Sequence, residues 1–240
     1  MSADTAFSLT TVGRSLIIPS SGHVKRKVAV EHCSEGKDTA DLFTEGRVGG
    51  FNLQLPASGM STIDFEVLCR DLETYSDSDA PFFTSPAAPT TTGILAAVNG
   101  LLRVGGQTVG VITGLNIQHQ LALSGDPVVG TNLMPDILAG RHLVSGQMTA
   151  FFENNDLIDA FRNESEISIL AYLTATSAAN APAMTFYLPR VKLGGANKPA
   201  QGEGAQSITL PFTALKYEGA EAATGIANTT LQIWDSEVTA

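Results

Sequence analysis

Residues 42–72 read LFTEGRVGGFNLQLPASGMSTIDFEVLCRDL, and this stretch sets the class of fold. Apolar, β-branched and aromatic residues recur through residues 42–55 and 60–72, and residues 56–59 (PASG) between them have the composition of a tight turn. Two strands separated by such a turn predict a β-hairpin. Because the same pattern recurs along most of the chain, the sequence predicts a mostly β protein.

Outward from this hairpin, runs of the same kind predict the remaining strands. They fall at residues 7–18, 25–33, 101–104, 109–123, 142–152, 167–176, 184–193, 207–217 and 229–234. The Gly105-Gly106 pair predicts that residues 101–104 and 109–123 are joined as a tight hairpin. One short helix is expected at residues 154–161, where an asparagine cap and an acidic first turn precede apolar residues.

A segment rich in Ser, Asp, Pro and Thr, residues 76–92, has the composition of a linker. It predicts a first, partial β module at residues 1–75 and a complete module at residues 93–240. Residues 47–68 and 190–215 share an Arg-Val pair, glycines and a Gly-x-x-x-Ile mark, which indicates a degenerate internal duplication. The alternative is that any two β-hairpins look alike at this level.

The charge of the chain limits the classes of partner. Its 240 residues include 14 Lys and Arg against 24 Asp and Glu, a net charge of −10. Such a balance opposes ordinary binding to nucleic acid phosphates. No apolar run is long enough to span a membrane, and the first residues lack the features of a signal peptide. We therefore expect no membrane association and a protein made in the cytoplasm.

The sequence offers no residues for catalysis, for a metal or for a cofactor. The histidines stand isolated at His23, His32, His119 and His142. Cys33 and Cys69 lack partners at zinc-site spacing and are expected to be small buried hydrophobes. No nucleophile elbow or phosphate loop occurs. We expect no enzymatic activity, which leaves a structural, self-associating protein or, alternatively, a soluble β-sandwich that binds a ligand or another protein.

Residues 124–140 (SGDPVVGTNLMPDILAG) are unusual because an apolar composition meets glycines and prolines that exclude a regular element. Apolar residues gathered in one exposed loop usually mark an association surface. The residues predicted to contact another copy are Val128, Val129, Leu133, Met134, Ile137 and Leu138. The alternative is a loop that folds back over its own core.

Several longer stretches resemble the major tail tube proteins of long-tailed (siphovirus-type) bacteriophages. They are residues 42–48, 53–65, 83–86, 93–100, 129–137, 144–153 and 188–196, and they occur in the order found in that family. The resemblance covers roughly residue 16 to the C-terminal end of the sequence.

The resemblance implies a β-sandwich-like tube module with one flanking helix, whose copies close into a β-barrel ring. Rings would stack into the hollow virion tail that conducts the DNA genome during ejection, with the hairpin and long loop forming inner barrel and inter-ring contacts. The implied partners are other copies of the chain and the tail tip and tail terminator proteins. A tape measure protein and DNA would pass through the lumen without specific binding.

The number of chains in a ring depends on the first half of the chain. Longer family members resemble a full duplication, whereas residues 7–75 lack the hairpin, long loop and helix. If these residues are the remnant of a module, three chains supply six similar sectors and close a trimeric ring of pseudo-sixfold shape. If they are an added appendage, six chains close the ring. The duplication favours three.

Overall fold

A computed structural model confirms the mostly β fold. It describes residues 14–17, 26–34, 36–85, 87–88, 91, 93–108, 112–131, 133–152, 155–176, 181–197, 206–219 and 228–236. The strands are β1 (Arg14–Ile17), β2 (Val28–Ser34), β3 (Thr39–Pro56), β4 (Thr62–Leu68), β5 (Asp71–Ser76), β6 (Ala96–Val104), β7 (Gln107–Thr108), β8 (Ile112–Gln120), β9 (Leu143–Phe151), β10 (Ile167–Thr174), β11 (Ala183–Leu193), β12 (Ser207–Ala214) and β13 (Leu231–Asp235). The helix α1 (Asp156–Arg162) follows β9, as predicted.

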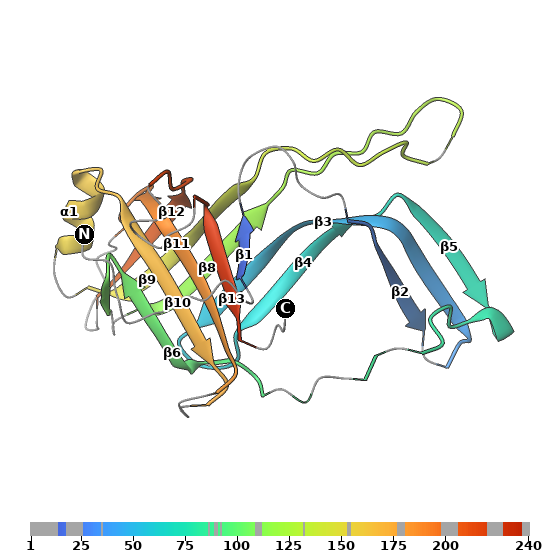
Figure 1. Ribbon diagram of the computed structural model, residues 1–240, viewed down its shortest axis with the longest axis horizontal. Coiled ribbons are helices and arrows are strands. Elements are labelled where there is room, and N and C mark those ends of the chain that lie inside the picture. Colours follow the sequence, from blue (N-terminus) through green and yellow to red (C-terminus); the bar gives the residue numbers. More distant parts are fainter. Residues whose placement is uncertain are drawn as a thin grey trace.

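The strands form one sheet that turns back on itself at β11. The strand order is β2-β3-β8-β9-β12-β11-β10-β6-β7, and β4 and β5 lie along the other edge of β3. One edge of β11 pairs with β10, while the other pairs with β13 near its start and with β12 near its end. As a result, β3, β8, β9 and β12 face β6, β10, β11 and β13 across a shared core (Figure 1).

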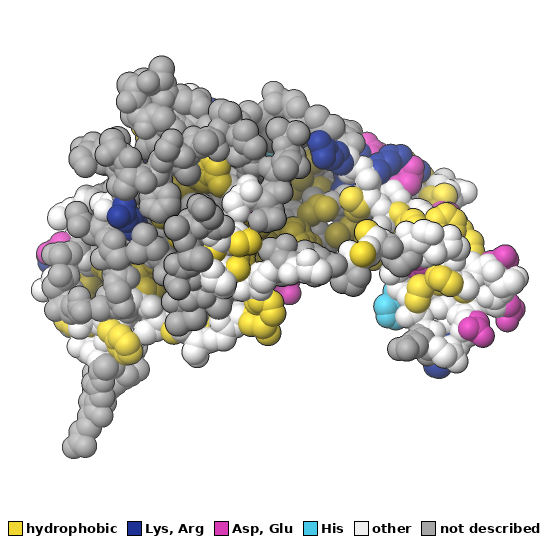
Figure 2. All heavy atoms as spheres, turned by 60° about the horizontal axis from the view of Figure 1, so that its bottom comes forward, with side chains coloured by type: hydrophobic (Ala, Val, Ile, Leu, Met, Phe, Trp, Pro, Cys, Tyr) yellow, Lys and Arg dark blue, Asp and Glu magenta, His cyan; other side chains and the backbone are white. Residues whose placement is uncertain are grey.

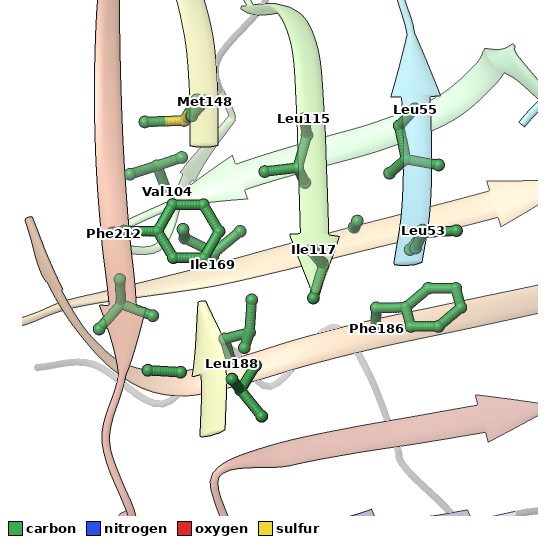
Figure 3. Close-up of a cluster of buried hydrophobic side chains, with 14 of the residues drawn as sticks. Leu53, Leu55, Val104, Leu115, Ile117, Met148, Ile169, Phe186, Leu188 and Phe212 are labelled. Carbon is green, nitrogen blue, oxygen red and sulfur yellow. The ribbon is translucent and has the colours of Figure 1, made fainter. Parts of the chain in front are cut away.

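Alternate side chains of these strands fill the core. Leu53 and Leu55 of β3 lie with Leu115 and Ile117 of β8 on one side, and Phe186 belongs to the opposite layer (Figure 3). All five are buried. Burial of one such side chain stabilises a fold by about 1.5–3 kcal/mol. This cluster therefore holds the two facing layers together, and we call these layers the body.

The hairpin at residues 42–72 is longer than predicted and is shared between two parts of the molecule. β3 is 18 residues long and pairs along one edge first with β5 and then with β4. Its other edge pairs with β2 over residues 39–46 and with β8 over residues 50–56. We call β2, residues 39–46 of β3 and β5 the arm, which extends away from the body in Figure 1. The single strand predicted at residues 60–72 is therefore two strands, β4 and β5.

The tight hairpin predicted around Gly105-Gly106 is wrong in its second strand. The two glycines do turn the chain, with φ of +60° and +82°. However, among the described residues after this turn, only the two residues of β7 pair back onto β6. β8 instead pairs with β3 and β9, and in this position its Leu115 and Ile117 are buried in the core.

Two smaller expectations also fail. Cys33 is exposed, because it lies on the arm outside the buried core, and Cys69 is only half-buried. Asn155 precedes α1 but makes no side-chain cap hydrogen bond. Among the described residues, no helix is long and apolar enough to cross a bilayer.

Two residues of the linker predicted at residues 76–92, Phe82 and Phe83, contact the arm. Both carboxylate oxygens of Glu31 accept hydrogen bonds, from the backbone N–H groups of Phe82 and Phe83 at 2.6 and 3.0 Å. The ring of Phe82 lies 5.2 Å from that of Tyr75. The sheet itself continues across the linker through the pairing of β3 with β8. The boundary between two modules and their duplication stay predictions.

Candidate functional site

One face of the sheet formed by β4, β3, β8, β9 and β12 carries mostly polar side chains on all five strands. In antiparallel strands, residues directly opposite each other lie on the same face. Asn52 lies opposite Asp64 of β4 and Gln118 of β8, and Gln118 lies opposite Ser145 of β9. The rows on either side of this one follow the same pattern, so the polar residues form a continuous surface.

We call this surface the polar face, and its members alternate with the buried core residues. They are Asn52, Gln54, Thr62, Asp64, Glu66, Asn116, Gln118, Gln120, Ser145, Gln147, Thr149, Ser207, Thr209 and Thr213, together with the apolar Leu143, Phe151 and Pro211. All are exposed or half-buried. Neighbouring amides join across strands, where Asn116 Nδ2 donates to Asn52 Oδ1 at 2.6 Å.

The polar face has no cationic side chain that could bind phosphate groups. Its only charged side chains are the carboxylates of Asp64 and Glu66. Arg47 of β3 continues the same side of the sheet beyond Glu66, but its side chain is buried beneath the long loop between β8 and β9. Binding to nucleic acid depends on cations that replace the counterions of phosphate groups. A face of amides, hydroxyls and carboxylates supplies none.

The second feature is the long loop, residues 121–142, which joins β8 to β9. Its two sides are held together by backbone hydrogen bonds between Ser124 and Leu138 at 3.0 and 2.8 Å. It extends from the body across the bend of β3 (Figure 1). There Arg47 Nη2 donates to Asp136 Oδ1 at 2.7 Å, and Arg70 Nε donates to the carbonyl of Met134.

These two arginines fix the position of the long loop. The side chain of Arg47 is only 10% exposed, so its charge depends on the carboxylate of Asp136 for compensation. Arg70 also pairs with Glu45, which accepts a second hydrogen bond from Lys27. That bond and the charge of Arg70 hold the pKa of Glu45 below its usual range. The loop is thus anchored by charge as well as by backbone.

The residues predicted to contact another copy divide into two groups. Val128, Val129, Leu133 and Leu138 are exposed, and Val129 is as open to solvent as an isolated residue. Met134 is half-buried, and Ile137 is fully buried within its own chain. The alternative of a loop folded over its own core therefore applies to Ile137, while the tip of the loop stays open.

Two of the histidines treated as isolated lie together at the base of the long loop. His119 Nε2 and His142 Nδ1 are 2.9 Å apart, and the rings stack with centroids 5.2 Å apart. His119 is buried and also contacts the ring of Phe51. His32 lies on the exposed arm, and His23 lies outside the described residues. Among the described residues, no group of three or more His, Cys, Asp or Glu side chains could hold a metal ion.

Sequence reasoning missed the polar face and the two anchoring arginines. The alternation of Asn116, Gln118 and Gln120 was a usable signal for the face. No local signal existed for the arginines, because Arg47 and Asp136 are 89 residues apart.

Comparison with known proteins identifies a family whose model matches most of this chain. A family model described as phage tail tube protein matches residues 3–214. A chain of the SPP1 tail tube, from a hybrid solid-state NMR and cryo-EM structure, aligns with 15% identity and a TM-score of 0.37, covering 48% of this chain and 70% of that chain. No curated protein matches the sequence.

Proposed function

This chain belongs to the phage tail tube protein family, and from that premise we propose that its copies form rings that stack into a hollow tube lined by the polar face. The protein is a structural component of the virion tail. The observation that carries the proposal is the polar face itself, whose residues on five neighbouring strands include no Lys or Arg, while the nearby Arg47 is buried and paired with Asp136. In this role Asp64 and Glu66 face the lumen and repel the phosphates of passing DNA.

Electron microscopy of the purified protein tests the tube. We expect rings and tubes of uniform bore in negative stain, with growth that depends on protein concentration. A protein that stays monomeric by light scattering under every condition would contradict the proposal and would favour a soluble β-sandwich module instead. The tail tip and terminator proteins are then expected at the two ends of the tube, where stacking stops.

The polar face makes a specific prediction about DNA movement. Gln118→Lys together with Gln54→Lys should leave tube length unchanged but slow DNA release from virions, because each copy then offers two cations to the phosphates. Release is followed with a DNA-binding dye at several salt concentrations, and the delay should shrink as salt rises.

The matched controls are Gln118→Glu, which adds charge of the opposite sign, and Asn163→Lys, which adds a cation at an exposed site just after α1. Neither should slow release. If the two lysines on the polar face left the release rate unchanged, that face would not line the lumen.

For the ring we propose three chains, closed with pseudo-sixfold shape. The recurrence seen in the sequence supports this, since Arg47 and Arg190 both lie on antiparallel hairpins and both pair with a carboxylate, of Asp136 and Glu166. Three copies of the five-stranded face would form a barrel of about 15 strands, roughly 30 Å in diameter, and six copies would give about twice both values. A cross-section of the tube by electron cryomicroscopy distinguishes the two.

A further inference from the structure

The core face of the long hairpin continues beyond the core. Phe51 lies opposite Phe65, Val48 lies opposite Val67, and Phe43 lies opposite both Leu72 and Val30. One-residue register shifts between these rows keep all of these apolar side chains on the side of the sheet that carries Leu53 and Leu55 in the body. A single apolar face therefore runs from the core out along the arm.

Only the part of this face that lies in the body is covered. Leu53 and Leu55 are buried, but the described residues of the second layer do not extend over β4 and the arm. The exposed part, which we call the apolar band, consists of Val30 (43% exposed), Phe43 (36%), Val48 (44%), Ile63 (40%), Phe65 (62%) and Leu72 (51%). Figure 2 shows hydrophobic side chains around a hollow between the body and the arm.

The opposite face of the arm is in contact with the linker. Tyr75 and Glu31 lie on that face, opposite Ala40 and Leu42, and there they contact Phe82 and Phe83 of the linker. Ala40 and Leu42 are buried on this face. Within the described part of the chain, the linker thus contacts one face of the arm, while the apolar band on the other face stays exposed.

We propose that the apolar band docks on the body of a second copy of this chain within the tube, an inference that rests on the proposed function. The six side chains expose on the order of 500 Å² of apolar surface, which is near the upper end for a monomer. With a polar rim, such a patch approaches the roughly 800 Å² that each partner contributes to a stable interface. A second copy is the occupant because every copy in a tube carries the same band, so identical contacts repeat around the axis.

The first test places charge in the band. Phe65→Glu together with Leu72→Glu should prevent ring formation, because two carboxylates would enter an apolar contact in every copy. Both residues are more than half exposed, so the monomer should keep its circular dichroism spectrum and melting temperature. The control pair is Asn163→Glu and Ser165→Glu, at exposed positions just after α1 and outside both the band and the polar face, and it should assemble as the wild type does.

The second test measures protection directly. In a Cys33→Ser, Cys69→Ser background, a thiol introduced by Leu72→Cys should react with maleimide in the monomer and be protected in the tube. A thiol introduced by Glu73→Cys, on the other face of β5, should react at nearly the same rate in both. A fall of at least tenfold at position 72 alone is the expected result.

The outcomes separate this inference from the proposed function. If the wild type forms no tube at all, the proposed function fails. If the wild type and the Phe65→Glu, Leu72→Glu variant form equal rings, or if position 72 is protected already in the monomer or stays reactive in the tube, the tube stands and docking of the apolar band is overturned.

Discussion

Replacing Val129 and Leu133 with aspartate should abolish tube growth while leaving the fold intact. Both side chains are exposed near the tip of the long loop, so the charges cost little in the isolated chain. In a contact between stacked rings each uncompensated carboxylate would cost roughly 3–5 kcal/mol. Since every copy contributes the same loop, the loss is multiplied around the ring. Negative-stain microscopy should show rings without tubes.

The control for this prediction is Val129→Ile together with Leu133→Met, which keeps the tip apolar and should preserve growth. Ile137 is excluded from the test although the sequence placed it in the same contact surface. It is buried, so Ile137→Asp would disrupt the anchoring of the long loop within one chain. Tubes of normal length from the double aspartate variant would show that the tip makes no contact between rings.

Gly146→Val should leave little or no folded protein. Gly146 lies in β9 between Ile117 of β8 and Phe212 of β12. A Cβ at this position would lie 2.1 Å from the backbone oxygen of Asn116 and 2.5 Å from Cζ of Phe212. A backbone oxygen cannot move aside without breaking the ladder, so we expect a destabilisation of about 4 kcal/mol or more.

Urea unfolding in the Val129→Asp, Leu133→Asp background measures this effect without interference from assembly. Gly114→Ala is the matched control, because Gly114 lies in the neighbouring strand β8 with nothing near the position of its Cβ. It should change stability by less than about 1 kcal/mol. Equal midpoints for the variants at positions 146 and 114 would show that the close packing of β8 against β9 is not required.

The strands could be predicted from sequence because their alternation is local. Residues 142–152 and 184–193 were expected as strands, and β9 and β11 match them within one residue at each end. Pairing could not be predicted in the same way. The Gly105-Gly106 turn predicted a partner for residues 101–104 close in sequence, yet apart from the two-residue β7 the partner of β6 is β10, with paired residues 65 to 78 positions apart. Which strands meet is decided by where the core residues can be buried.

The candidate site was predicted only in part, for the same reason. The long loop was identified from its composition, but burial of Ile137 depends on how the loop folds back. The polar face needs the register of five strands, since a shift of one residue would turn Gln118 into the core. The apolar band was invisible because its residues look like ordinary core positions in the sequence. Only the extent of the second layer shows that Phe65 and Leu72 are uncovered.

The pairing of β1 with β13 determines when the sheet can be completed during synthesis of the chain. Arg14 of β1 lies opposite Trp234 of β13, and β13 in turn completes the edge of β11. At a synthesis rate of about 5–20 residues per second, β1 waits for roughly 10–50 s before its partner leaves the ribosome. A nascent chain therefore lacks a finished second layer, and contacts of such high sequence separation form slowly. We expect that chains still attached to ribosomes cannot nucleate tubes, so growth begins from completed, released protein.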